Sequence, residues 1–81
     1  MTVDELINEF DDETWVSLGY AGLPSKDRTV VWLADYVGAD LSVMAKLKPW
    51  AGKRVDGAYL TVGPDPETGD TAGMLCIDVE V

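Results

Sequence analysis

The chain has 81 residues, a length that supports one hydrophobic core and therefore a single domain over residues 1–81. Hydrophobic residues make up 47% of the sequence, which excludes wholesale disorder. Fifteen Asp and Glu residues against six Lys and Arg give a net charge of −9, which argues against binding a nucleic-acid backbone and favours attraction to a basic partner.

A helix is predicted over residues 3–12. Thr2 and Glu5 have the spacing of a capping box, in which each side chain accepts a hydrogen bond from the backbone N–H of the other residue. Acidic residues crowd the far end of this segment, where the helix dipole disfavours anions. The apolar residues of the segment recur at helical spacing: Val3, Leu6, Ile7 and Phe10.

Two strands are predicted in the next part of the chain. Residues 14–20 are rich in strand-forming residues, and Val16, Leu18 and Tyr20 alternate with Trp15, Ser17 and Gly19, which is typical of a short strand. Residues 21–27 contain Gly and Pro and form a loop. Residues 28–37 are rich in β-branched and aromatic residues, which favours a second strand. A helix opened by Ser25 and closed by Gly38 is the alternative for this last segment.

Residues 40–48 fit two structures. Their apolar residues alternate as in a strand, but Asp40 is a good N-cap and Pro49 would end a helix. We expect a short helix here. Residues 50–57 follow as a basic loop.

The last third of the chain is predicted to organise the fold. Residues 58–62 and 73–81 have the pattern of two strands joined by a connection much longer than a tight turn. We therefore expect an α+β fold, a small antiparallel sheet of roughly three to five strands with the N-terminal helix and the 40–48 helix on one face. In the second of these strands one face carries Leu75, Ile77, Val79 and Val81, and the other carries Met74, Cys76, Asp78 and Glu80.

Catalytic and metal-binding residues are scarce. The chain has no His that would activate a Ser or its lone Cys76. Asp35 with Asp78 would be one acid–base pair. Two acids in such a sequence are more often solvent-facing or capping carboxylates than catalytic groups. The acids of residues 65–70 lack the spacing of a calcium loop. We expect no enzymatic activity, no cofactor and no metal.

The sequence predicts a cytoplasmic protein. Cys76 has no second cysteine with which to form an intrachain disulfide, which fits a reducing compartment. No stretch approaches roughly 18 apolar residues, so we expect no membrane helix. Asp4 and Glu5 stand where a signal peptide would need positive charge.

The acids gather toward both ends of the sequence, whereas all six basic residues lie between them. Carboxylates displayed at spacings comparable to those of phosphates would fit a basic groove that evolved for nucleic acid, although acidity also serves solubility alone. Trp50 is expected to be exposed in the basic loop, beside Lys53 and Arg54. The predicted partner-binding residues are Glu9, Asp11, Asp12, Glu13, Trp50, Asp65, Glu67 and Asp70.

In size, acidity and lack of catalytic residues, the chain resembles small phage-encoded inhibitors, among them anti-CRISPR and anti-restriction proteins. The likeness covers no motif, so no residue roles carry over. We expect a non-enzymatic module, an inhibitor that docks an acidic face on a basic or nucleic-acid-binding surface of a larger protein, without binding nucleic acid or membrane itself. The alternative is a structural or assembly protein that self-associates, for instance as a homodimer, through an edge strand at residues 74–81.

Overall fold

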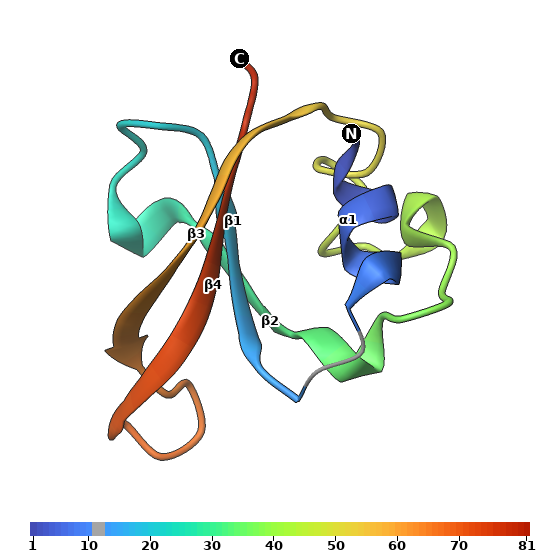
Figure 1. Ribbon diagram of the computed structural model, residues 1–81. Helices are drawn as coiled ribbons and strands as arrows, with labels where there is room; N and C mark the ends of the chain where they lie inside the picture. The colour runs from blue at the N-terminus through green and yellow to red at the C-terminus, as the bar shows by residue number, and fades with distance from the viewer. Residues whose placement is uncertain (11–12) are drawn as a thin grey trace.

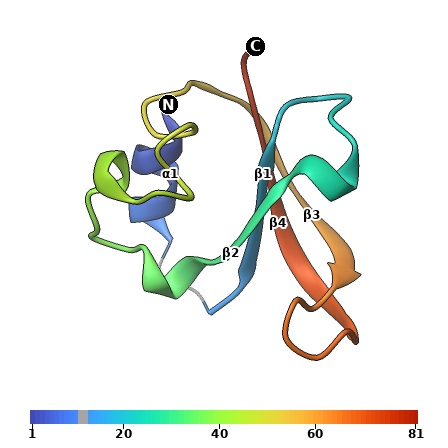
Figure 2. The same ribbon diagram turned by 180° about the vertical axis from the view of Figure 1, so that it is seen from behind.

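A four-stranded sheet with a helical layer on one face makes up the fold (Figure 1). The structure is a computed structural model that describes residues 1–10 and 13–81. The two views, front and back, place the loop over residues 20–28 on the opposite side of the sheet from the helix (Figure 2). The helical elements are α1 (Val3–Glu9) and the short 3-10 helices η1 (Ser25–Asp27), η2 (Leu33–Asp35) and η3 (Leu41–Val43).

The expected α+β fold is confirmed, but the sheet is mixed rather than wholly antiparallel. The strand order is β2-β1-β4-β3, in which only β1 and β4 run parallel. A parallel pair needs a long crossover, and the chain between these two strands supplies one. The strands are β1 (Trp15–Gly19), β2 (Thr29–Trp32), β3 (Val55–Pro64) and β4 (Thr71–Val79).

The hydrophobic core lies between the sheet and α1. Because successive strand residues point to opposite faces, the residues next to those in the core face away from α1. Ser17 of β1 and Cys76 of β4, which are paired in register, belong to this other face. The core residues that are almost fully buried include Val3, Ile7, Val16, Leu18, Leu33, Leu47 and Ile77.

The helix α1 forms where it was predicted but is shorter. The capping box is present, and the N–H of Thr2 donates to Oε1 of Glu5 at 3.3 Å. The helix ends at Glu9, and the N–H of Phe10 donates to the carbonyl of Ile7. It therefore stops where the run of acids begins, at the end that the dipole makes unfavourable for anions.

The strand predicted over residues 28–37 forms only in the first part of this range. β2 ends at Trp32, and the N–H of Leu33 donates to the carbonyl of Thr14 at 2.8 Å. The turn η2 then redirects the chain, so that Leu33 is buried and Tyr36 packs against the core. The helix alternative for this segment is wrong.

The short helix expected over residues 40–48 is reduced to one 3-10 turn, and the strand alternative for this segment is wrong. The segment contains only η3, followed by turns in which the N–H of Lys48 bonds to the carbonyl of Met44 and that of Ala51 to the carbonyl of Leu47. Pro49 has no N–H to continue a ladder of such bonds. The segment is attached to the core by two separate buried side chains, Leu41 and Leu47, and not by the continuous apolar stripe of a helix.

The segment proposed as an edge, residues 74–81, is not one. β4 lies in the sheet between β1 and β3 and is hydrogen-bonded to both. Its regular alternation of apolar residues, which organises the fold as expected, suits an interior strand that packs against a core. The edges of the sheet are β2 and β3.

Candidate functional site

The face of the sheet turned away from α1 is the candidate functional surface. From β2 to β3 its rows run Trp32, Trp15, Met74 and Thr61, and then Val30, Ser17, Cys76 and Tyr59. Among the described residues, α1 covers the opposite face, whereas η1 belongs to the 20–28 loop on this side (Figure 1). We call this surface, defined by these eight residues, the open face.

An arginine closes one end of the open face. The Arg28 side chain lies across Gly19, and its Nη1 is 2.8 Å from Oδ1 of Asp78. Its Nε donates to Oγ of Ser17 at 2.8 Å, and its Nη2 donates to the carbonyls of Ser17 and Ile77, each at 3.0 Å. The guanidinium therefore ties β1 to β4 and is engaged within the chain.

Beside Arg28 lies a pocket of about 510 Å³ under the 20–28 loop. Its floor is Ser17, Met74 and Cys76, and Tyr59 forms part of its wall. Contact with the Cys76 thiol raises the pKa of the Tyr59 hydroxyl above its ordinary value. The ionic groups of this pocket, Arg28 and Asp78, are satisfied by each other.

At the other end of the open face lies a second pocket of about 460 Å³, which combines aromatic rings with carboxylates. The rings of Trp15 and Trp32 meet edge to face, with centroids 5.1 Å apart and an interplanar angle of 65°. Its lining is Trp15, Val30, Val31, Trp32, Asp35, Tyr36, Lys46, Asp65 and Glu67. We call it the acid–aromatic pocket.

Asp65 fixes the geometry of this pocket. Its Oδ2 accepts the Nε1–H of Trp15 at 3.3 Å, and its Oδ1 accepts the N–H of Glu67 at 2.7 Å and that of Thr68 at 3.3 Å. The backbone N–H of Glu67, then that of Thr68 and the Trp15 ring, hold the pKa of Asp65 below its ordinary value. The turn after β3 is thereby held against the start of β1.

The predicted site residues are divided by the structure. Asp65 and Glu67 line one pocket, and Glu13 is exposed just before the start of β1. Glu9 is exposed on α1, in the layer behind the sheet. Asp70 is exposed in the β3–β4 connection, where its N–H donates to Oγ1 of Thr68. The remaining two acids, Asp11 and Asp12, lie outside the described residues.

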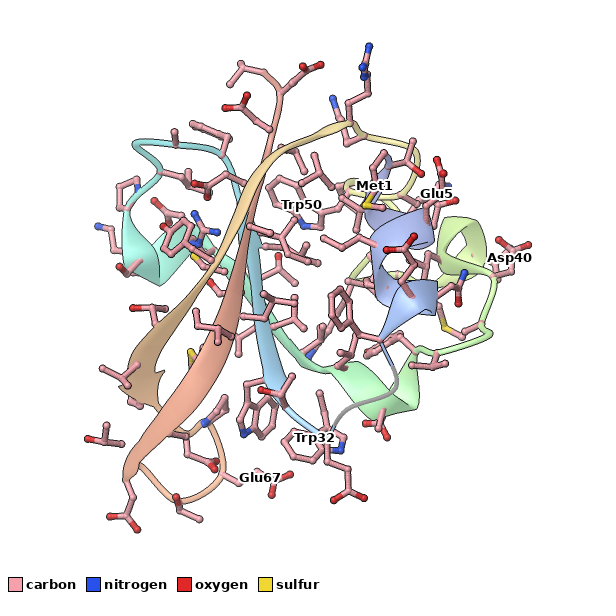
Figure 3. All side chains as sticks on the ribbon, viewed as in Figure 1. Met1, Glu5, Trp32, Asp40, Trp50 and Glu67 are labelled. Carbon is pink, nitrogen blue, oxygen red and sulfur yellow. The ribbon has the colours of Figure 1, made fainter. Side chains whose placement is uncertain are left out.

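The exposed position expected for Trp50 is wrong. Its ring packs against the core, and its Nε1–H donates to Oγ1 of Thr29 at 3.0 Å. Figure 3 shows Trp50 between the sheet and α1, with Trp32 and Glu67 at the opposite end of the molecule. Pro49 breaks the local structure here, but the wide apolar ring still reaches the core.

Several of the acids near the termini serve the fold. Asp4 accepts the N–H of Gly52 at 3.3 Å, and the Thr2 hydroxyl, followed by backbone donors that include this one, lowers the pKa of Asp4. Glu80 lies 3.8 Å from the guanidinium of Arg54. Asp78 is likewise bound to Arg28, so Asp4, Asp78 and Glu80 each have a partner within the chain.

Asp35 and Asp78 do not form the acid–base pair that was considered from the sequence. Asp35 lines the acid–aromatic pocket with Trp15, whereas Asp78 lies opposite Gly19 at the far end of β1. Within residues 1–10 and 13–81, no group of three or more His, Cys, Asp or Glu side chains is placed to hold a metal ion. In the same part of the chain, no helix is long and apolar enough to cross a membrane.

Trp15, Trp32 and Arg28 line the two pockets of the open face but are not among the residues predicted from the sequence to bind a partner. Their signal was present in the alternation of the two strands, because Trp15 and Trp32 fall on the opposite face from Val16 and Val31. The register that sets the two rings side by side could not be read from the sequence. No family model matches the chain, and no match is found among the curated proteins or the solved structures.

Proposed function

We propose that this protein is a non-enzymatic protein-binding module that docks on a basic surface of a larger protein and inhibits it. The acid–aromatic pocket is the observation that supports this proposal most directly. It sets the edge-to-face pair of Trp15 and Trp32 beside the carboxylates of Asp35 and Glu67. The net charge of −9 adds a long-range attraction to a basic partner.

An arginine or lysine side chain of the partner is the group that this pocket suits. A cation over an indole face gains about 0.5–1 kcal/mol at an exposed site and about 2 kcal/mol when desolvated. A guanidinium can also form two parallel hydrogen bonds with one carboxylate, which adds direction to the contact. Asp35 and Glu67 are both exposed at this pocket, whereas the third carboxylate of its lining, Asp65, already accepts hydrogen bonds from Trp15 and from the turn.

The rest of the open face supplies area for docking. Val30 lines both the acid–aromatic pocket and the pocket under the 20–28 loop, so the two depressions adjoin on one surface. A basic side chain would therefore serve as an anchor within a larger contact, as aromatic and arginine residues do at protein interfaces. The partner surface that we propose is basic, such as a groove that normally holds nucleic acid. Targets of phage-encoded anti-CRISPR or anti-restriction inhibitors have surfaces of this kind. We therefore propose that the protein acts in the cytoplasm, where such targets are found.

Capture of the partner from a lysate of the source cells tests this proposal. Immobilised wild-type protein should retain a basic protein at low salt and lose it as salt rises, because exposed charges are screened beyond about 8 Å at physiological ionic strength. The variants Glu67→Gln and Trp32→Ala should each weaken retention. Quantitative mass spectrometry of the bound fraction measures the loss.

Glu9→Gln is the matched control, since it removes the same charge from the exposed face of α1, outside the pocket. It should retain the partner almost as well as the wild type. If Glu9→Gln and Glu67→Gln weaken binding equally, general acidity and not the pocket governs docking. If no retained protein depends on Glu67 or Trp32, the proposed function is wrong.

A further inference from the structure

The edge strand β3 lacks the features that keep most sheet edges from pairing. At its first residue the N–H of Val55 donates to the carbonyl of Met1 at 2.8 Å, but residues 57–63 pair only with β4. These seven residues include no charged residue and no proline. Natural edge strands are usually protected by lysines, prolines or bulges. In β3 such features occur only at the two ends, a bulge beside Asp56 and the ring of Pro64. Asp56 and Pro64 are equally distant in sequence from Leu60, so the open segment is centred on that residue.

The hydrogen-bonding pattern shows which backbone groups face outward from β3. The N–H of Asp65 donates to the carbonyl of Asp70 at 2.7 Å, at the start of the antiparallel ladder between β3 and β4. Hydrogen-bonded and non-hydrogen-bonded residue pairs alternate along such a ladder. The N–H and C=O groups of Ala58, Leu60 and Val62 therefore point away from β4, toward the open edge.

The side chains of the same residues form an apolar strip on the side of α1. Leu60 is 82% exposed and Val62 is 70% exposed. Next to them an apolar groove of about 500 Å³ runs between β3 and the end of α1. The groove is lined by Leu6, Phe10, Thr14, Leu33, Ala58, Tyr59, Leu60 and Leu75.

We propose that β3 pairs antiparallel with β3 of a second copy of this chain, with Leu60 on the two-fold axis. In this register Leu60 faces its own copy, Ala58 faces Val62, and Gly57 faces Gly63 of the partner chain. All of these side chains are neutral, and the small residues fall opposite the larger ones or opposite each other. The bulge at Asp56 and the ring of Pro64 end the pairing at both sides.

The second copy is the occupant that the symmetry of this edge favours. An isologous contact requires a segment that is complementary to itself, and the open segment is bounded equally on both sides of Leu60. Cross-strand neighbours lie on the same face of a sheet, so α1 of both copies would lie on one side. The two apolar grooves would then adjoin, and Leu60 and Val62 of each chain would be buried at the contact between the two copies.

This pairing goes beyond the proposed function and does not depend on it. Each copy carries a net charge of −9, so the two copies repel each other at long range. Salt screens this repulsion, and salt does not weaken the burial of apolar side chains. Dimerisation should therefore strengthen as salt rises, whereas docking on a basic partner should weaken.

Sedimentation equilibrium over a range of protein concentrations and at two salt concentrations tests the pairing. The wild type should show a monomer–dimer equilibrium that shifts toward dimer at higher salt. Leu60→Lys should raise the dimer dissociation constant by about tenfold or more, because it sets two like charges opposite each other on the two-fold axis. Val43→Lys is the matched control, because Val43 is 73% exposed on η3, away from β3, and should leave the constant unchanged.

Cysteine crosslinking tests the register. In the proposed pairing Leu60→Cys brings two thiols to a Cα separation of about 5.5 Å, within the range of a disulfide. Val62→Cys would leave its two thiols four positions apart along the strand, about 13 Å, and should not crosslink. Cys76 is buried and contributes little to oxidation in either variant.

A wild-type protein that remains monomeric at every concentration and salt level overturns the proposal. So does a dimer that Leu60→Lys leaves intact. Crosslinking of Val62→Cys in preference to Leu60→Cys would overturn the proposed register. Circular dichroism of Leu60→Lys should match that of the wild type, since the side chain is exposed in the single chain.

Discussion

At the scale of single residues, Arg28 is a largely buried charged side chain that ties β1 to β4. Its guanidinium donates to Ser17, Asp78 and the carbonyl of Ile77, and its side chain is only 10% exposed. Removing one partner of such a buried pair usually costs about 3–5 kcal/mol, because the other charge is left uncompensated. Arg28 thus joins the ends of two strands that lie far apart in the sequence.

Gly19 makes room for this arginine, which gives a testable prediction. A Cβ at position 19 would lie 2.9 Å from Nη1 of Arg28, so Gly19→Ala must displace the guanidinium. We expect a loss of about 1–3 kcal/mol in the free energy of unfolding, measured by urea denaturation. Gly73→Ala is the control, because a Cβ there meets no atom within 4 Å, and should stay within about 0.5 kcal/mol of the wild type. Equal losses in the two variants would contradict this role of Gly19.

At the scale of elements, the connection between β3 and β4 depends on a charged Asp65. Backbone donors, first the N–H of Glu67, hold the pKa of Asp65 below its ordinary value of 3.8 in the folded protein. A group whose folded pKa is lowered stabilises the fold at pH values above its unfolded pKa, and this contribution is lost as the pH falls through the folded pKa.

Asp65→Asn should therefore be less stable than the wild type at pH 7, and the difference should shrink toward zero well below pH 3.8. Urea denaturation of both proteins at neutral and acidic pH measures this difference. Only the difference between the two proteins is informative, because protonation also changes the repulsion among the other acids. A gap that stays constant over this pH range would show that the charge of Asp65 does not stabilise the turn.

The elements with strong local signals could be predicted from the sequence. The capping box marked the start of α1. The alternation of β4 marked its core face, with Ile77 and Val79 buried as expected, whereas Val81 lies beyond the strand and is exposed. The irregular segment from Leu41 to Gly52 could not be predicted, because two buried leucines and a proline do not specify a periodic element. Long-range register was equally hidden, since the parallel pairing of β1 with β4 depends on contacts between distant residues.

The candidate site shows the same division. Asp65 and Glu67 were predicted from charge alone, and both line the acid–aromatic pocket. Trp15 and Trp32 were not among the predicted site residues, because their contact depends on how β1 pairs with β2. Trp50 was misjudged because a loop position does not reveal whether a ring turns back to the core.

At the scale of the whole molecule, the two faces of the sheet have different tasks. One face packs against α1 and holds the core, with Trp50 among the residues packed against it. The other exposes the acid–aromatic pocket, in which Trp15 donates to Asp65 beside Trp32 and Glu67. The proposed docking on a basic partner uses this second face, and the proposed pairing through β3 would extend the sheet and leave this face open.

The indole N–H signals of the three tryptophans test the docking surface most directly. In a two-dimensional NMR titration with an arginine-rich peptide, the signals of Trp15 and Trp32 should shift, and an acidic peptide of equal length should leave them in place. Trp50 is the internal control, because its Nε1–H is bonded to Thr29 on the core side. Shifts of Trp15 and Trp32 with an unmoved Trp50 are the predicted result. Equal movement of all three signals, or no movement with the basic peptide, would contradict the proposal that the acid–aromatic pocket receives a basic side chain.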